Sequence, residues 1–437
     1  MSNVRFAAAA IRIPAGEGQT TEAPLRATAM VIDTPQRLCF ISCDTLIIPA
    51  DVLEEATRQV VAEAGVSFEH LLVCATHNHH APSTIDILGF SRDKIFCAHL
   101  RAAIVKAAVS AAHALDTPGR DSKELRAELL FGESQEATVG MNSRYLLKDG
   151  SIAWHSYSWD DVVRPTGSCD PDMAVLAFRR PTGELAGLMF NHSVHNIGSL
   201  NPYTWSPAFY GLAAQELERR HGGTALFLPG AFGSTHNTGS FGAGRVPHSL
   251  AVSTEECVHR VSAAVEEGLG IAQPVILDPV RVLKRPFMYC IRSFDEAREE
   301  TTVKVWSEKF TPGNAGELQR DFRAMRKTLA PLQGQELRTW VQVIRLGNIA
   351  IVGIPGELFA SLGIEIRRRS PFRWTYLVGL ANGTIGYVGD SAAYRLGGYQ
   401  LWAGQHSPSA PGTGEALVEQ VIAMLTELFN GVRVGGD

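Results

Sequence analysis

The sequence is poor in charged residues, in aromatic side chains and in long apolar runs. Only 19% of its 437 residues are charged and 8% are aromatic, whereas 45% are hydrophobic. This composition excludes a disordered chain or a charged tail protein, because such chains have too little apolar surface to bury. Lys and Arg number 40 and Asp and Glu 45, so the net charge is −5. A mildly acidic chain has no general attraction to nucleic acid, and we expect no nucleic-acid partner.

Segments that would direct or anchor the chain to a membrane are also scarce. No apolar run reaches the ~18–20 residues that a bilayer span requires. Residues 1–13 lack the basic start and apolar core of a signal peptide. The seven cysteines form no CxxC pair, and Cys39, Cys43 and Cys74 lie in apolar runs typical of buried thiols. These features predict a cytoplasmic protein with no stable membrane anchor.

Apolar strand-like runs alternate with helical patterns along the chain. This order predicts an α/β or α+β fold in which helices flank mixed sheets. Strands are expected at residues 38–43, 71–75, 173–178, 185–190, 226–228, 341–346, 349–354 and 376–380. Polar clusters follow several of these runs, and active sites of α/β proteins collect at such strand ends. We find no internal repeat and expect one domain over 1–437, with any sub-domain boundary near the polar segment 295–330.

Histidines follow two of the predicted strands. His77 and His79 lie on the same side of an extended segment, so both imidazoles can reach one site. An HxH pair often begins a zinc site, although it also occurs in solvated loops. His192 and His195 follow the second strand and favour the metal or catalytic interpretation. Glu357 follows Pro355-Gly356 and is expected in the first turn of a helix, where the helix dipole favours a carboxylate.

Five segments together resemble the catalytic domain of the neutral, non-lysosomal ceramidase superfamily. They are Thr76–Pro82 (THNHHAP, where the family has THTHSGP), Gly140–Arg144, Phe190–His192, Pro355–Glu357, and Gly379–Asn382 followed by Tyr387, Tyr394 and Tyr399. Each motif is weak alone, but all five occur in the family's order between residues 76 and 399. The resemblance implies a ceramidase-like catalytic fold with its metal site at the C-terminal ends of strands.

The resemblance also implies a site. It implies one zinc ion per chain, held by His77, His192, Glu357 and Tyr387. It implies that His79 moves protons beside the metal, and it places Tyr399, Arg144 and His236 near the substrate pocket. His195 is an alternative ligand or a partner of the ligands, since the alignment can slip within this cluster. Whether His80, His195 or His236 binds a second metal ion is left open by the sequence.

The segment after residues 226–228 departs from the family. Ser234 replaces an aspartate, His236 stands at a substrate-side serine, and His80 replaces the serine of THTHS. The chain also ends soon after the catalytic domain should end, so we expect no C-terminal β-domain. The changes surround the pocket while the four implied ligands remain. We therefore expect a zinc-dependent hydrolase of an amide bond in a small, polar substrate other than ceramide.

Other interpretations stay open at this point. The same scaffold would suit an ester or lactone hydrolase, or a catalytically silent protein that binds zinc or a small molecule. A metallo-β-lactamase would need an Asp-His pair after the histidines, and a barrel amidohydrolase a later lysine or aspartate. A two-metal phosphoesterase would need more carboxylates near the histidines. The sequence does not decide between a monomer and a homo-oligomer.

Overall fold

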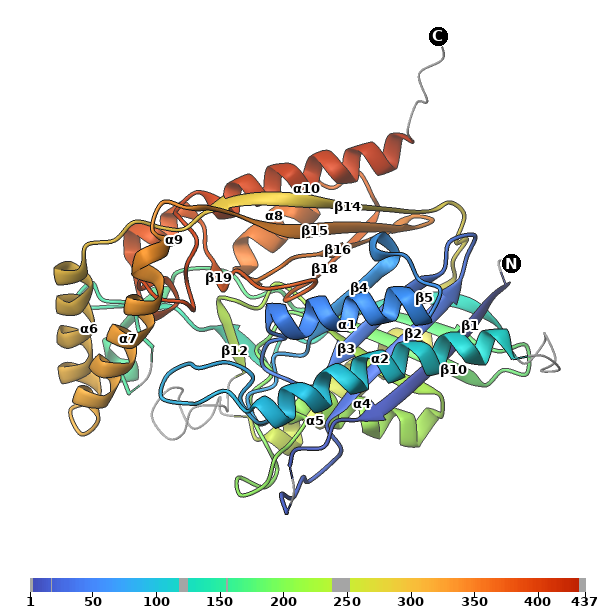
Figure 1. Ribbon diagram of the computed structural model, residues 1–437, viewed down its shortest axis with the longest axis horizontal. Coiled ribbons are helices and arrows are strands. Elements are labelled where there is room, and N and C mark those ends of the chain that lie inside the picture. The colour runs from blue at the N-terminus through green and yellow to red at the C-terminus, as the bar shows by residue number, and fades with distance from the viewer. Residues whose placement is uncertain (1–2, 17, 118–124, 155, 238–251, 432–437) are drawn as a thin grey trace, which may run out of the picture.

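Two β-sheets pack face to face at the centre of the molecule, with helices on both outer sides (Figure 1). The computed structural model describes residues 3–16, 18–117, 125–154, 156–237 and 252–431. This architecture confirms the expected α/β class with mixed sheets. The molecule has four layers in the order helices, large sheet, small sheet and helices. The two sheets pack on each other through their inner faces, and each outer face is covered by a layer of helices.

The large sheet has the strand order β11-β10-β9-β5-β1-β2-β3-β4, with β13 paired to β5. Its strands are β1 (Asn3–Arg12), β2 (Arg26–Asp33), β3 (Leu38–Cys43), β4 (Leu71–Ala75), β5 (Arg126–Gln135), β9 (Asp172–Arg179), β10 (Leu185–His192), β11 (Thr224–Pro229) and β13 (Gln273–Pro274). Its central strands are apolar on both faces because both faces are covered. Every residue of β3 is buried.

The large sheet curls, so strands near its opposite edges come close together. The Ser42 hydroxyl of β3 donates a hydrogen bond to the Phe227 carbonyl of β11 at 2.6 Å. The segments that follow β4 and β10 therefore meet, although five strands lie between β10 and β4 in the order of the sheet. This curl brings the two predicted histidine clusters to one place.

The small sheet has the order β14-β15-β16-β18. Its strands are β14 (Val280–Cys290), β15 (Glu336–Leu346), β16 (Ile349–Gly353) and β18 (Trp374–Val378). Alternate residues face its two sides, as strand geometry requires. Ile344 and Ile351 pack against the large sheet, whereas Val343 and Val352 pack beneath α8 (Ala360–Arg369) and α10 (Thr413–Asn430).

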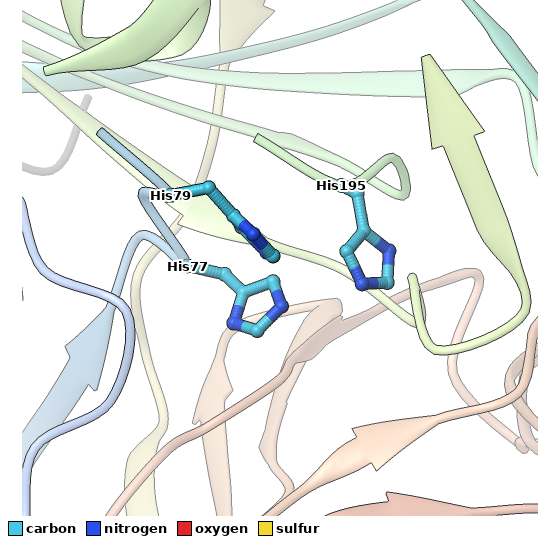
Figure 2. Close-up of side chains that lie close together, drawn as sticks. All are labelled: His77, His79 and His195. Atoms are coloured by element: carbon cyan, nitrogen blue, oxygen red, sulfur yellow. The ribbon is translucent and has the colours of Figure 1, made fainter. Parts of the chain in front are cut away.

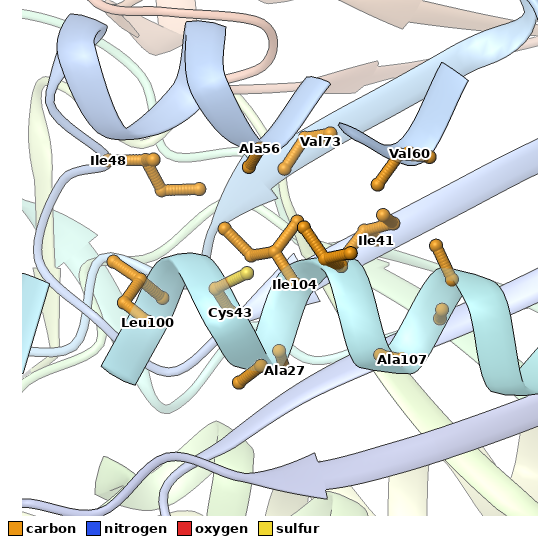
Figure 3. Close-up of a cluster of buried hydrophobic side chains, with 14 of the residues drawn as sticks. Ala27, Ile41, Cys43, Ile48, Ala56, Val60, Val73, Leu100, Ile104 and Ala107 are labelled. Carbon is orange, nitrogen blue, oxygen red and sulfur yellow. The ribbon is translucent and has the colours of Figure 1, made fainter. Parts of the chain in front are cut away.

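The outer face of the large sheet is covered by four helices. They are α1 (Ala50–Glu63), α2 (Lys94–Asp116), α4 (Ala208–His221) and α5 (Thr254–Ile271). Figure 3 shows Leu100, Ile104 and Ala107 of α2 packed against α1 and the strands. By length and composition alone, α2 could cross a membrane, so the expectation that no apolar segment is long enough was wrong. Its most apolar window is 56% buried within the protein, as in a core helix.

The polar segment 295–330 forms a pair of helices, α6 (Glu296–Phe310) and α7 (Ala315–Leu329), which pack on each other at one end of the molecule (Figure 1). Short elements line the same end. They are β6 (Gly140–Asn142), β7 (Tyr145–Leu147), β8 (Val162–Pro165), β12 (Thr235–Asn237), β17 (Glu357–Leu358), β19 (Tyr387–Val388) and α9 (Ser391–Leu396). Of these, β17 and β19 carry two of the predicted ligands.

Candidate metal centre

Four buried side chains from distant parts of the chain meet in one cluster, which we call the central cluster: His77, His195, Glu357 and Tyr387. The Glu357 Oε2 atom lies 3.4 Å from His77 Nε2 and 3.4 Å from His195 Nε2. The Tyr387 hydroxyl oxygen lies 3.3 Å from His195 Nε2. Two nitrogen and two oxygen donors therefore face one another within one small volume.

Backbone carbonyls orient the two histidines of the cluster. The Nδ1 atom of His77 lies 3.1 Å from the Leu46 carbonyl, and that of His195 lies 3.0 Å from the Phe232 carbonyl. A carbonyl only accepts, so each Nδ1 carries the proton and each Nε2 presents its lone pair to the cluster. His77 has a φ of 56°, which is unusual outside glycine and turns the chain sharply after β4.

Glu357 and Tyr387 are partners in a parallel pair of two-residue strands, β17 and β19. The Glu357 amide donates to the Gly386 carbonyl at 2.9 Å, and the Tyr387 amide donates to the His406 carbonyl at 2.9 Å. The expectation that Glu357 begins a helix was therefore wrong, because α8 begins three residues later. Close packing also fixes this strand: a Cβ atom at Gly233 would lie 2.1 Å from the Glu357 carbonyl oxygen.

The structure does not bring His192, predicted as a ligand, to the central cluster. His192 Nε2 lies 3.1 Å from the Glu136 carbonyl and Nδ1 lies 2.6 Å from the Tyr210 hydroxyl, so both ring nitrogens are engaged. His192 is the last residue of β10 and shares a strand face with Phe190, toward α4. The chain turns only after the strand ends, and His195 is the residue that reaches the cluster. We correct the set of candidate ligands accordingly.

His79 lies beside the central cluster and is accessible from the adjoining cavity. Figure 2 shows the rings of His77, His79 and His195 pointing toward one another, and one ring nitrogen of each lies within 4.8 Å of the others. The ring centroids of His77 and His79 are 4.7 Å apart. The surrounding protein lowers the pKa of His79 well below its usual value, and the neighbouring His195 and His80 lower it further.

The central cluster fits a metal ion. Tetrahedral bonds of about 2.0–2.1 Å place neighbouring donor atoms about 3.3 Å apart, which matches the three donor distances above. His77 Nε2 and Glu357 Oε2 are buried and have no hydrogen-bond partner in the described part of the chain. Desolvation by burial lowers the pKa of His77. Desolvation by burial also raises the pKa of Tyr387, and the nearby charge of Glu357 raises it further. A bound cation would satisfy the unpaired atoms and favour the ionised oxygen donors.

A cavity of about 610 Å³ opens onto the cluster. Its polar end is formed by His77, His79, Glu357, Tyr387, Tyr399 and His406. Its walls are mostly apolar and include Leu46, Ile47, Ile85, Ile87, Leu88 and Phe90. Pockets of this size and character bind small organic molecules. The cavity therefore adjoins the candidate metal centre on the side from which a substrate can reach it.

Tyr399, predicted near the substrate pocket, lines the cavity. Its ring stacks on Trp154 with centroids 3.9 Å apart, and it lies 5.9 Å from the ring of Tyr387. His236 lies on the other side of His195, with ring centroids 4.5 Å apart, and it is absent from the described cavity lining. The structure thus places both residues beside the central cluster, one at the cavity and one behind it.

Arg144, predicted at the substrate pocket, is buried behind the cavity and does not line it. Its guanidinium donates to Gln400 Oε1 at 2.9 Å and to the Gly397 carbonyl at 2.5 Å. Burial lowers the pKa of Arg144 to about 10, so it remains charged at neutral pH. These contacts hold the segment that carries Tyr399, which is a positioning role. Sequence analysis could not separate this role from direct contact with a substrate.

We expect the Arg144→Met variant to lose stability and keep its metal. Methionine leaves the Gly397 and Gln400 oxygens without their donor, which should lower the free energy of unfolding by about 1–3 kcal/mol. Urea unfolding and metal analysis of the same samples measure both quantities. A variant with the stability of the wild type and a slower turnover would contradict the positioning role and indicate that Arg144 takes part directly in catalysis.

His406 gives the fold an acid sensitivity that the sequence did not predict. Burial lowers its pKa from 6.5 to about 4. Between these values the unfolded chain binds a proton that the folded chain excludes, so stability falls as the pH drops below 6.5. We expect His406 to account for about 3 kcal/mol of the stability lost between pH 7 and pH 4. Urea unfolding at both pH values should show a smaller loss for His406→Gln; an equal loss would contradict this assignment.

The fold, two packed mixed sheets with helical outer layers, is similar to that of solved ceramidases. The solved neutral ceramidase from Pseudomonas aeruginosa aligns with all of this chain and 75% of its own, with a TM-score of 0.70 and 19% identity. A second solved structure, a ceramidase complexed with C2, aligns with 99% of this chain and 76% of its own, with a TM-score of 0.70 and 20% identity.

Sequence comparison leads to the same protein. The neutral ceramidase of Pseudomonas aeruginosa is 24% identical over 92% of this chain and 67% of its own length. No model of a known protein family matches the chain. The chain is thus a distant homologue of neutral ceramidase, which confirms the resemblance seen in its motifs.

Proposed function

We propose that this protein is a zinc-dependent amidohydrolase. The observation that carries the proposal is the central cluster, where two imidazoles, a carboxylate and a phenol present their donor atoms at tetrahedral spacing. Zinc is the metal we propose because its sites combine imidazole nitrogen with carboxylate oxygen at such distances. One zinc ion per chain would be held by His77, His195, Glu357 and Tyr387.

The chain's own residues supply the remaining chemistry. A zinc ion, when bound, would polarise the amide carbonyl and lower the pKa of a neighbouring water. His79 is accessible from the cavity and uncoordinated in the proposed ligand set, so it can take a proton from the attacking water and deliver it to the leaving amine. Tyr399, held by its stacking on Trp154, forms part of the wall against which the substrate lies.

A panel of amides and matched esters tests the proposal. Zinc-loaded protein should release amine from at least one class of N-acyl amide, a chelator should stop the reaction, and zinc should restore it. Hydrolysis of esters or lactones alone would replace the amidase by an ester hydrolase on the same site. Stoichiometric zinc without any hydrolysis across the panel would overturn the proposal and leave a protein that binds zinc or a small molecule.

A further inference from the structure

β4 is the terminal strand of the large sheet, and its free side is bound by Asn382. The Asn382 amide donates to the Val73 carbonyl at 2.8 Å, and the Val73 amide donates to Asn382 Oδ1 at 3.3 Å. A buried main-chain donor and acceptor are costly to leave unpaired, and Val73 is buried. Asn382 satisfies both, which gives the last residue of the Gly379–Asn382 motif a defined contact.

Asn382 connects the two parts of the chain that carry the candidate ligands. β4 ends at Ala75 and leads directly to His77, whereas Tyr387 follows Asn382. The segment of Asn382 is also hydrogen-bonded to the segment that carries Glu357. These main-chain hydrogen bonds are 2.7–3.1 Å long and join Ile354 to Val378, Gly356 to Leu380, Ile354 to Ala381, Pro355 to Ile385 and Glu357 to Gly386. The position of β4 against Asn382 therefore sets the position of His77 against Glu357 and Tyr387.

The carboxamide of Asn382 is oriented by two side chains of the small sheet. Lys284 Nζ donates to Asn382 Oδ1 at 3.1 Å, and Asn382 Nδ2 donates to Gln342 Oε1 at 2.8 Å. Lys284 lies on β14 and Gln342 lies on β15, and the two are directly opposite in the register of these strands. An ammonium group only donates, so Lys284 determines which atom of the carboxamide accepts from Val73.

The same two side chains hold the turn that leads into β4. Lys284 Nζ also donates to the Phe68 and Leu71 carbonyls, at 3.1 and 2.9 Å. Gln342 Nε2 donates to the Glu69 carbonyl at 2.7 Å. The acceptors of Lys284 Nζ match the three protons of an ammonium group, which lies 4.0 Å from the centre of the Phe68 ring. Lys284 and Gln342 therefore hold β4 and Asn382 together, and we call these three residues the clamp.

We propose that the clamp positions His77 against the other side of the central cluster and thereby sets the affinity of the cluster for metal. This inference rests on the proposed function, because it requires the zinc ion. None of the clamp residues lines the cavity among the residues that the structure describes, so they are positioning residues that act through the main chain. Distances between a metal and its ligands tolerate errors of only about 0.2 Å, so a small displacement of β4 weakens binding.

Replacing Asn382 by glycine tests the clamp with the least other damage. Asn382 has a φ of 60°, which glycine adopts without strain, and glycine keeps the amide that binds the Val73 carbonyl. We expect the zinc dissociation constant to rise about 10–100-fold, the usual effect of removing a group that supports a ligand. Competition with a zinc-binding dye, starting from metal-free protein, measures this constant. Hydrogen exchange of the metal-free variant should also show faster exchange of the Val73 amide.

Ser134→Ala is the matched control for a lost buried hydrogen bond. Ser134 Oγ donates to the Ala264 carbonyl at 2.6 Å and joins β5 to α5. This variant should be less stable in urea unfolding and should keep its zinc affinity. Asn382→Asp keeps an acceptor for Val73 and Lys284, so it should recover most of the affinity lost in Asn382→Gly. A folded Asn382→Gly variant with wild-type zinc affinity would overturn the inference, whatever its stability.

Lys284→Met tests the clamp from its other end and does not depend on the folding of Asn382→Gly. Methionine retains much of the apolar stem and removes the donor. The zinc dissociation constant should rise in this variant too, and wild-type affinity in the folded variant would overturn the inference. In the double variant, the rise should be smaller than the product of the two single rises, because both substitutions remove the same hydrogen bond to Asn382 Oδ1. A rise equal to that product would show two independent effects and overturn the clamp.

The results for the wild type separate this inference from the proposed function. If the wild type binds zinc but hydrolyses no amide, and the clamp variants lose affinity as expected, the amidohydrolase is overturned and the clamp is supported. If the wild type hydrolyses an amide and the clamp variants keep their affinity, the clamp is overturned and the amidohydrolase is supported. A wild type that binds no zinc would overturn both.

Discussion

Replacing His195 by alanine is expected to remove most of the bound metal and abolish turnover. His195 Nε2 faces both oxygen donors of the central cluster, at 3.4 Å from Glu357 Oε2 and 3.3 Å from the Tyr387 hydroxyl. Residues that only orient ligands typically change metal affinity 10–100-fold when mutated, so loss of a ligand should exceed about 100-fold. Competition with a zinc-binding dye measures the affinity of the purified variant.

His192→Asn is the matched control for this experiment. Both ring nitrogens of His192 are engaged away from the cluster, so the variant should lose stability and keep the metal affinity of the wild type. Circular dichroism establishes that each variant is folded before its affinity is compared. The opposite pattern, with metal lost in His192→Asn and kept in His195→Ala, would restore the ligand set that the sequence motifs implied.

Replacing His79 by alanine is expected to separate metal binding from catalysis. Zinc should stay bound, because the four donors of the central cluster are untouched. The rate should fall about 10²–10⁴-fold, the usual contribution of a general acid–base group. The measurement is kcat at saturating zinc, across a range of pH, on the best amide of the panel.

The pattern of results assigns the role of His79. The variant should also lose the limb of the pH–rate profile that reports proton transfer by this group. Unchanged turnover would remove His79 from the mechanism. A large loss of zinc would make His79 a ligand together with His77 and His195, whose ring nitrogens lie within 4.8 Å of its own. His79→Gln, which retains polarity without a titratable ring, should resemble the alanine variant in rate.

The sheets and helices could largely be predicted, because each buried strand is a nearly continuous apolar run. Residues 38–43 and 185–190 were predicted as strands and lie in β3 and β10. The position of α2 in the core was not predicted. Its apolar residues are distributed around most of the helix surface, so the sequence shows no distinct amphipathic pattern. The curl of the large sheet depends on contacts such as Ser42 with Phe227, which join residues 185 positions apart and leave no local signal.

The site was predicted less completely, for a related reason. His77 and His79 are identified by local spacing, whereas Glu357 and Tyr387 meet through strands of two residues that exist only as a pair. Between His192 and His195, sequence spacing alone cannot show where β10 ends and the chain turns. Arg144 has the residue type of a substrate-binding group and the burial of a structural one, and only the fold distinguishes them.

The most direct test of the metal centre is the zinc content of the wild-type chain. The protein is purified without a metal-binding tag, incubated with zinc, dialysed and analysed by elemental mass spectrometry. One zinc ion per chain, falling to near zero in Glu357→Ala, is the result predicted by the central cluster. Two ions per chain would indicate a dinuclear site that includes further histidines. A chain that binds no zinc after this treatment would contradict the metal centre and the hydrolase built on it.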